Sequence, residues 1–243
     1  MTHRFFIPPD WLTPPTVTLQ GDTARQIKTV LRLKPDDLIV VLDNSGQAWQ
    51  VKLTDVGKSQ ITGEIIAQQA TSSEPAIQLT LYQGTLKAQK FEWVLQKGTE
   101  LGISRFVPTI CQRSIVTKIE TKKYIRWQRI IQEAAEQSQR GKLPELTPTL
   151  PFPEAVQQAQ SADIALIPWE EAPAAASLKQ HLTALQGQSL AMFIGPEGGF
   201  TPAEVDQAQN AGLNTITLGP RILRAETAGL ALSTAILYEL GEW

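Results

Sequence analysis

Hydrophobic and polar positions alternate within short segments of the first seventy residues, a period typical of half-buried strands. Turn-forming residues separate these segments, and Asn44-Ser45-Gly46 predicts a hairpin. One stretch differs, because apolar residues recur at helical spacing over residues 22–33 before Pro35-Asp36 ends the pattern. An open sheet of so many short strands would leave exposed edges, so the pattern favours a small closed β-barrel. The expected strands are RFFI, TVTL, DLIVVLD, AWQVKL and SQITGEII.

The pattern changes after a polar stretch at residues 68–75, which indicates a linker. Apolar strands then alternate with segments of helical spacing, which is typical of an α/β domain with a mainly parallel sheet. We therefore expect two domains, a β-barrel over residues 1–70 and an α/β domain over residues 75–243. The expected strands are 77–83, 106–110, 163–167, 190–194 and 215–218; the expected helices are 87–101, 121–140, a segment that Thr201 and Glu204 cap, and 225–240.

Composition excludes several classes of protein. The chain has one cysteine, Cys111, and two histidines, so it has neither an internal disulfide nor a zinc site of Cys and His ligands. We expect no metal, and we expect Cys111 to be a small core residue. No apolar run approaches the roughly 18 residues of a membrane span, and the proline-rich start does not match a signal peptide. These features predict a cytoplasmic protein with no membrane partner.

Charge is unevenly distributed along the chain. Residues 1–83 carry a net charge of −1, residues 84–142 carry +7, and residues 143–243 carry −8. A basic middle segment beside an acidic C-terminal third indicates an anionic partner for the middle segment. The alternative is a set of solvated helix faces, which charge alone would favour.

Two glycine-rich loops follow predicted strands: IGPEGGF at residues 194–200 and LGPRILRAETAGLA at residues 218–231. Glycine lets backbone groups approach a ligand closely, and open α/β sheets bind ligands beyond the carboxyl ends of their strands. Neither loop has the phosphate-binding pattern GxxxxGK(S/T) or GxGxxG, and Glu197 would repel a phosphate. The loops therefore favour a ligand with a positive centre, such as the sulfonium of S-adenosylmethionine (SAM).

These loops, together with KGTELGISRFVP (residues 97–108), EAAEQSQR (133–140) and VLRLKPDD (30–37), resemble one known family over essentially the whole chain. The chain resembles the RsmE enzymes of the SPOUT superfamily, which methylate N3 of one uridine in 16S rRNA. The resemblance implies a C-terminal trefoil-knotted SPOUT domain that binds SAM, and an N-terminal PUA-like barrel. It also implies a homodimer, with 16S rRNA or the small ribosomal subunit as the partner.

By this resemblance, backbone groups of the two loops and of one preceding strand would hold SAM. We expect the side chains of Ile222 and Leu223 to pack in the core, so that only their backbone faces the cofactor. The implied residues are Ile167, Gly195, Pro196, Gly198, Gly199, Leu218, Gly219, Ile222 and Leu223.

Methylation of uridine at N3 needs help, because the imide nitrogen is a poor nucleophile until its proton leaves. An enzyme lowers this cost by stabilising the developing negative charge. Arg221 and Arg224 lie in the second loop, and a guanidinium there could stabilise the uridine anion. Alternatively, these arginines bind helix-terminal carbonyls or pair with Glu226, which we expect to be structural. Glu197 is the third catalytic candidate, as a base or a ligand of the SAM amine, or else a solvated turn carboxylate.

The basic middle segment would then contact RNA phosphates. Cys111 lies far from both loops in sequence, and methylation at carbon 5 of a pyrimidine usually needs a cysteine adduct, so a nitrogen or oxygen target is favoured. Two alternatives stay open: a SPOUT enzyme acting on another RNA position or on a ribose 2′-oxygen, and a catalytically silent rRNA-binding assembly factor. The expected RNA contacts are Arg4, Arg32, Lys97, Arg113 and Arg140.

Overall fold

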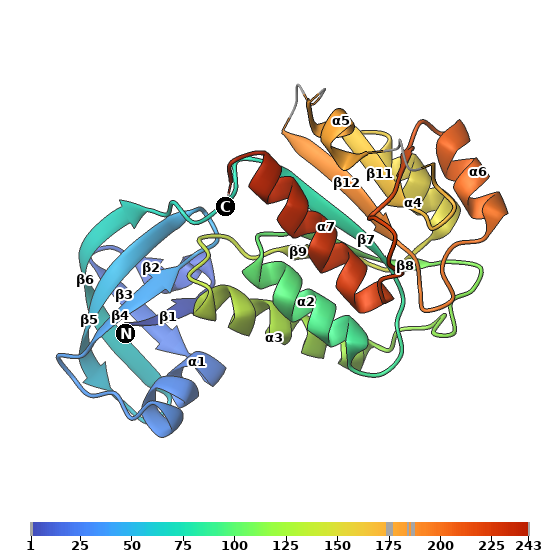
Figure 1. Ribbon diagram of the computed structural model, residues 1–243. Coiled ribbons are helices and arrows are strands. Elements are labelled where there is room, and N and C mark those ends of the chain that lie inside the picture. Colours follow the sequence, from blue (N-terminus) through green and yellow to red (C-terminus); the bar gives the residue numbers. More distant parts are fainter. Residues whose placement is uncertain (1, 174–176, 184, 186–187, 243) are drawn as a thin grey trace. The chain divides into compact units, whose positions relative to one another are not determined.

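The computed structural model describes residues 2–173, 177–183, 185 and 188–242 and shows a mixed α/β protein of two compact units (Figure 1). The first unit runs to Glu74 and includes Ala135–Leu143, and the second comprises Pro75–Ala134 and the chain from Pro144 onward. The expected division assigned residues 135–143 to the second domain. Within the described ranges, none of the helices combines the length and the apolar composition required to cross a bilayer.

The first unit is a six-stranded sheet in the order β1-β4-β5-β6-β3-β2, in which only the β1–β4 pair is parallel. Alternate residues such as Val17, Leu19, Ile39 and Val41 are fully buried in one core, as the alternating pattern predicted. The sheet path ends at β1 and β2, so complete closure of the barrel stays a prediction. The strands are β1 (His3–Phe6), β2 (Leu12–Thr13), β3 (Thr16–Gln20), β4 (Leu38–Leu42), β5 (Gln47–Val56) and β6 (Gln60–Ala70).

The apolar spacing predicted a helix over residues 22–33, but the observed helix ends earlier, at Val30. A 3₁₀ turn at Pro9–Trp11 precedes it, and the stretch itself consists of α1 (Gly21–Arg25) and one π-helical turn (Gln26–Val30). Arg32 has a φ of 56°, a left-handed conformation that no helix continues through. The chain therefore leaves the helix before the proline that was expected to end it.

A buried ion pair holds residues 135–143 within the first unit. Arg140 is 3% exposed, and its Nη2 donates to Oε2 of Glu74 at 2.5 Å. The N–H groups of Gly141 and Lys142 donate to Oε1 of the same carboxylate at 2.9 Å and 3.2 Å. Burial alone raises the pKa of Glu74, but Arg140 and these N–H groups outweigh it and leave the pKa below its usual value. The expected phosphate contact at Arg140 is therefore wrong, because its charge is buried and already paired.

The second unit is built on a seven-stranded sheet in which every ladder is parallel. The main path runs β10-β8-β7-β12-β11-β13, with β9 paired to β8. This arrangement confirms the α/β class expected from the alternation of strands and helices. The strands are β7 (Gln78–Gly84), β8 (Arg105–Ile110), β9 (Glu145–Leu146), β10 (Leu150–Pro151), β11 (Ile164–Pro168), β12 (Ser189–Ile194) and β13 (Asn214–Ile216).

Helices cover both faces of this sheet (Figure 1). The capping box expected at Thr201 and Glu204 is present at the start of α6. Two short helices, α4 and α5, were not expected from the sequence. The helices are α2 (Lys90–Glu100), α3 (Thr121–Gln137), α4 (Phe152–Ala159), α5 (Leu178–Thr183), α6 (Pro202–Asn210) and α7 (Ala225–Glu239).

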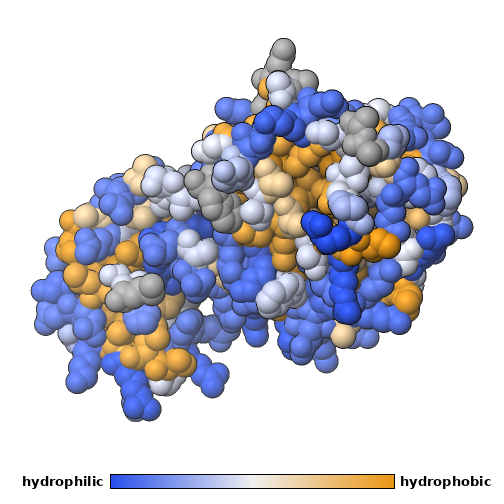
Figure 2. Space-filling model, viewed as in Figure 1, coloured by the Kyte–Doolittle hydropathy of each residue, from blue (hydrophilic) through white to orange (hydrophobic). Residues whose placement is uncertain are grey.

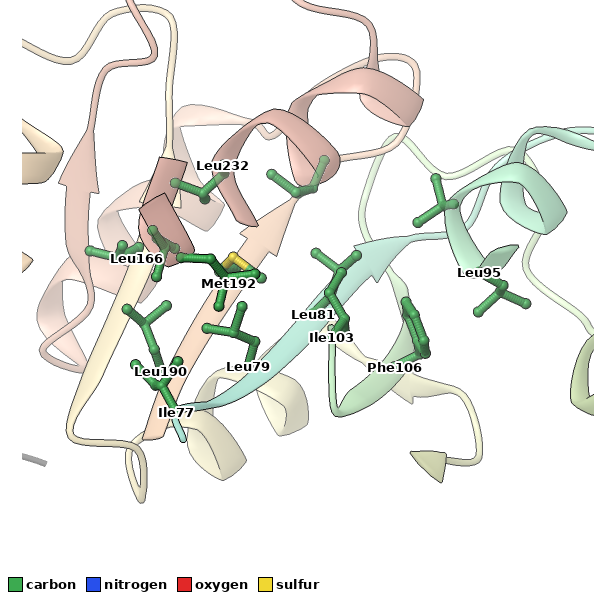
Figure 3. Packing of buried hydrophobic residues seen from close by; sticks show 14 of the residues in the cluster. Ile77, Leu79, Leu81, Leu95, Ile103, Phe106, Leu166, Leu190, Met192 and Leu232 are labelled. Atoms are coloured by element: carbon green, nitrogen blue, oxygen red, sulfur yellow. The ribbon is translucent and has the colours of Figure 1, made fainter. Parts of the chain in front are cut away.

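Alternation along the central strands divides the core of the second unit in two. Leu190 and Met192 of β12 belong to the cluster that includes Leu95 of α2 and Leu232 of α7 (Figure 3). Ala191, which lies between them, and Phe193, the next residue along, belong to the opposite cluster, with residues of α4 and α6. Both faces of the strands are thus buried, which explains their nearly continuous apolar sequences.

We expect Arg140→Met to destabilise the first unit by about 2 to 3 kcal/mol, because it leaves a partly buried carboxylate without its cation. Arg126→Met is the matched control: this guanidinium is 61% exposed and pairs with Glu92, so its loss should cost less than about 1 kcal/mol. Urea unfolding measures both free energies.

The pH dependence follows from the lowered pKa of Glu74. The ion pair stabilises the protein above the ordinary glutamate pKa of about 4.3, and that stabilisation is lost as pH falls through the folded-state value. The difference between wild type and Arg140→Met should therefore shrink in acid. Equal losses for both variants at pH 7, or a difference that acid leaves unchanged, would contradict this role.

Candidate functional site

The carboxyl ends of three neighbouring parallel strands meet at one edge of the second sheet. The loops that follow β11, β12 and β13 line a cavity of about 570 Å³. Such an edge is where open α/β sheets bind ligands, because strand ends and helix starts leave backbone groups unpaired there. This is the site that the two glycine-rich loops predicted.

Most of the residues expected to bind the cofactor line this cavity together. Ile167 does not, since it is fully buried inside β11, and its neighbour Pro168 lines the cavity instead. The expected residues in the lining are Gly195, Pro196, Gly198, Gly199, Leu218, Gly219, Ile222 and Leu223, with the three catalytic candidates Glu197, Arg221 and Arg224.

Sequence reasoning missed the loop that follows β11. Trp169, Glu170 and Glu171 line the cavity, and the Trp169 N–H donates to the Ile216 carbonyl at 3.0 Å. This loop contains no glycine, so nothing in its sequence marked it as a ligand loop. The loop lies at the cavity because β11 is next to β13 in the sheet. With that strand order known, the adjacent carboxylates Glu170 and Glu171 would have marked it as part of the site.

Close backbone approach shapes the loop after β12. A Cβ on Gly84, the last residue of β7, would lie 2.4 Å from the nitrogen of Pro196 and 2.7 Å from the carbonyl carbon of Gly195. Only glycine permits this contact without a shift of the backbone. Gly199 has a φ of +68°, and its N–H donates to the Pro196 carbonyl at 2.9 Å. The loop is thus a tight turn that leaves its backbone facing the cavity.

Arg113, expected as an RNA contact, lies at this loop. Its Nη1 donates to the carbonyl oxygens of Gly198 at 2.9 Å and Phe200 at 3.2 Å. The residue remains exposed and lines the cavity. Next to it, the Gln112 N–H donates to Oε1 of Glu204 at 2.8 Å, which joins this segment to the start of α6. Arg113 therefore stabilises the conformation of this loop.

Glu197 is anchored to the start of α2. Its Oε1 accepts a hydrogen bond from the Lys87 N–H at 3.0 Å and lies 3.8 Å from the Lys90 ammonium. The same ammonium lies 3.4 Å from Oε1 of Glu226 on α7. The Glu197 side chain is 24% exposed, and its carboxylate is engaged by these contacts. These contacts hold its loop against α2.

Arg224 occupies the N-cap position of α7, and its carbonyl accepts hydrogen bonds from Thr227 and Ala228 at 2.9 Å. Its side chain is 80% exposed, with Nη1 4.0 Å from Oε1 of Glu226. Arg221 is exposed as well. The side chain of Ile222 is 77% exposed, so the expectation that it packs in the core is wrong. This segment presents two guanidinium groups and one apolar side chain at the cavity.

Cys111 is far from both glycine loops in the sequence. In the structure it is close to the cavity, because it lies two residues before Arg113. It is 4% exposed and belongs to the core cluster around Phe152 and Phe200, as expected. Burial, aided by the charge of Glu204, raises the pKa of its thiol. A buried neutral thiol that does not line the cavity is a poor nucleophile.

The remaining expected RNA contacts are not brought together at the cavity. Arg4 is half-buried on β1, where burial lowers its pKa. Arg32 is exposed in the first unit, and the Lys97 ammonium binds Glu100 at 2.7 Å on α2. Among the described residues, no group of three or more His, Cys, Asp or Glu side chains is placed to hold a metal ion.

The positive φ of Gly199 gives a test of the loop. No atom outside its immediate neighbours lies within 4 Å of a Cβ there, so backbone strain rather than crowding should decide the effect of a substitution. We expect Gly199→Val to cost at least about 1 to 2 kcal/mol of folding free energy, and Gly199→Asn less, because asparagine tolerates the left-handed region. Urea unfolding measures both. Equal losses would show that φ is not the constraint.

The comparisons with known proteins agree with this architecture. A family model described as RNA methyltransferase domain matches residues 72–237, and one described as RNA methyltransferase PUA domain matches residues 19–66. The chain is 34% identical to ribosomal RNA small subunit methyltransferase E of Bacillus subtilis (strain 168), over 93% of this chain and 91% of that protein. It is 32% identical to the protein of the same name from Synechocystis, over 94% of this chain and 75% of that protein.

Among solved structures, the chain is similar to a ribosomal RNA small subunit methyltransferase E from Neisseria gonorrhoeae bound to S-adenosyl methionine. That match has a TM-score of 0.89 and 33% identity, and it covers 98% of each chain. The fold, the position of the cavity and these relatives lead to one conclusion: the chain belongs to the ribosomal RNA small subunit methyltransferase E family.

Proposed function

We propose that this protein binds SAM in the three-loop cavity and methylates N3 of a specific uridine in 16S rRNA of the small ribosomal subunit. The observation that carries the proposal is the convergence of the predicted cofactor and catalytic residues on one cavity. Membership of the family supports the reaction class, since its members are named rRNA small subunit methyltransferases. The assignment of N3 rests on the resemblance to RsmE enzymes.

The residues at the cavity fit SAM. A volume of about 570 Å³ lies within the range of roughly 300 to 1,000 Å³ typical of small-molecule sites. Glycine backbone faces it from two loops, so amide and carbonyl groups are accessible to an adenine and a ribose. The carboxylates of Glu170 and Glu171 complement the positive centres of SAM, and Arg113 complements its carboxylate.

SAM, when bound, supplies a methyl group activated by its positively charged sulfur. The side chains at the mouth of the cavity would prepare the nucleophile. The exposed guanidinium of Arg224 would stabilise the negative charge that develops on the uridine ring, and Arg221 would hold a neighbouring phosphate. Glu197 fits a loop anchor better than a base, because the Lys87 N–H and the Lys90 ammonium already engage its carboxylate.

The state of Cys111 supports a nitrogen target over carbon 5. A carbon-5 methyltransferase of the usual type needs a thiolate that attacks the pyrimidine ring. Here the only cysteine is buried, its pKa is raised, and it does not line the cavity. A nitrogen needs only deprotonation and alignment, which the arginines at the mouth can assist.

We infer that rRNA phosphates contact the exposed cations that remain from the predicted set. The exposed Arg32 and Arg113 can neutralise phosphates, and the half-buried Arg4 and Lys97 can do so with the part of each side chain that reaches solvent. Phosphate contacts of this kind make affinity fall steeply with salt, because counterions are released. We also infer a cytoplasmic activity, because the proposed substrate is ribosomal.

The role of Arg224 is testable by kinetics. Arg224→Ala should lower the single-turnover rate of 3-methyluridine formation on the order of 10²-fold or more at saturating SAM, the loss expected for one preorganised charge donor. SAM affinity measured by calorimetry should change little. The rate loss should shrink as pH rises, because more uridine then loses its proton unaided.

Arg224→Lys is the matched variant, and it should restore little, because an ammonium lacks the planar, two-pronged contact of a guanidinium. A fully active Arg224→Ala enzyme would remove Arg224 from the mechanism. Loss of SAM binding in that variant would instead make Arg224 a cofactor ligand.

We further propose that a second copy of the chain covers the outer face of α7, which would form the homodimer that the resemblance implies. Thr227, Leu230, Ala231, Thr234 and Tyr238 line a shallow, mostly apolar groove there, and Tyr238 is 73% exposed. Figure 2 shows apolar side chains over this helix. Small residues at helical spacing allow a partner helix to approach closely, and all the residues that line the groove belong to α7, whose N-cap is Arg224.

We expect Ala231→Glu to shift the protein from dimer to monomer in analytical ultracentrifugation, because a charge would be buried in the apolar contact. Ala203→Glu on α6 is the control, since Ala203 is also exposed but lies outside the groove. A wild-type monomer at micromolar concentration, or a dimer that survives Ala231→Glu, would rule out this interface.

A further inference from the structure

One lysine joins the two glycine-rich loops of the cavity. Lys90 is the first residue of α2, and its ammonium lies 3.4 Å from Oε1 of Glu226 and 3.8 Å from Oε1 of Glu197. Glu197 belongs to the loop after β12, and Glu226 lies in the first turn of α7. Lys90 itself does not line the cavity. Its ion pairs connect it to the cavity through these two carboxylates.

Glu226 is shared between two cations. Its Oε1 lies 3.4 Å from Lys90 Nζ and 4.0 Å from Arg224 Nη1. The Glu226 side chain is only 16% exposed, whereas the Arg224 side chain is 80% exposed. A carboxylate with so little solvent needs a cationic partner, and Lys90 is the nearer of the two. The Arg224 guanidinium lies 4.0 Å from this carboxylate, which is beyond hydrogen-bond distance.

Loss of Lys90 would change this balance. Glu226 would lose the nearer of its two cations, and the guanidinium of Arg224, 4.0 Å away, would be its remaining ion-pair partner among the described residues. Arginine forms strong two-pronged pairs with carboxylates, so Arg224 would turn toward Glu226 and away from the mouth of the cavity. Glu197 would retain its hydrogen bond from the Lys87 N–H, so its loop would keep one anchor.

We propose that Lys90 is a positioning residue that neutralises Glu226 and so leaves Arg224 free to face the RNA substrate. This inference rests on the proposed function, in which Arg224 stabilises the uridine anion. The position of the Arg224 side chain, by contrast, can be tested without any substrate.

The first test is structural. In a crystal structure of Lys90→Met, the shortest distance between the Arg224 guanidinium and the Glu226 carboxylate should fall from 4.0 Å to about 2.8 Å, the length of a charge-assisted hydrogen bond. In the double variant Lys90→Met with Glu226→Gln, Arg224 should stay open to solvent. An unchanged Arg224 in Lys90→Met would overturn the proposal, whatever reaction the protein catalyses.

The second test is kinetic and uses the same variants. Lys90→Met should lower the single-turnover rate on the order of 10-fold, less than Arg224→Ala does, because Arg224 is diverted rather than removed. The added Glu226→Gln should restore most of that rate, since the carboxylate that captures Arg224 is neutralised. Lys90→Arg should keep the rate, and the affinity for SAM should change little throughout.

Lys87→Met is the matched control, because it removes a charge from the same turn but keeps the backbone N–H that binds Glu197. It should reduce the rate less than Lys90→Met does. If the double variant is as slow as Lys90→Met, or if SAM affinity and thermal stability fall with the rate, Lys90 is merely structural. If Arg224 closes onto Glu226 as expected but wild type forms no 3-methyluridine, the positioning claim holds and the proposed function fails.

Discussion

The parallel register of the central strands is the constraint on which the site depends. Gln83 of β7 pairs with Ile194 of β12, and Pro168 of β11 pairs with Ile216 of β13, so adjacent strands end at the same level. Three loops that are distant in sequence therefore begin side by side. Burial on both faces fixes this register, since a shift by one residue would exchange the two apolar cores. The cavity is a consequence of sheet packing.

Backbone contacts and a few charged side chains then determine the shape of the loops at the end of the sheet. Gly84 permits the loop after β12 to lie against the end of β7, and Arg113 binds two carbonyls of the same loop. Lys90 and the Lys87 N–H bind the Glu197 carboxylate of this loop. The loop is thus fixed before any ligand arrives, which lowers the conformational cost of binding.

Local patterns in the sequence were sufficient for the α/β class, the capping box at Thr201 and both glycine loops, because each depends on residues a few positions apart. Contacts between distant residues were not predictable in this way. Arg140 pairs with Glu74, 66 residues away, and its burial could not be inferred from its neighbours in sequence. Trp169 and the two carboxylates after it line the cavity because β11 lies between β12 and β13, and local sequence patterns do not give this strand order. The contacts of Lys90 were not predictable either, since one partner, Glu197, follows β12 and the other, Glu226, lies in α7.

We expect the cavity to transfer the methyl group of SAM to N3 of one uridine. The most direct measurement is mass spectrometry of nucleosides from small-subunit rRNA of a strain that lacks this protein, before and after incubation of its subunits with the protein and SAM. We expect 3-methyluridine to be absent before incubation and present afterwards at one position. A ribose-methylated nucleoside, a methyl group on carbon 5, or no new methyl group at all would contradict this expectation.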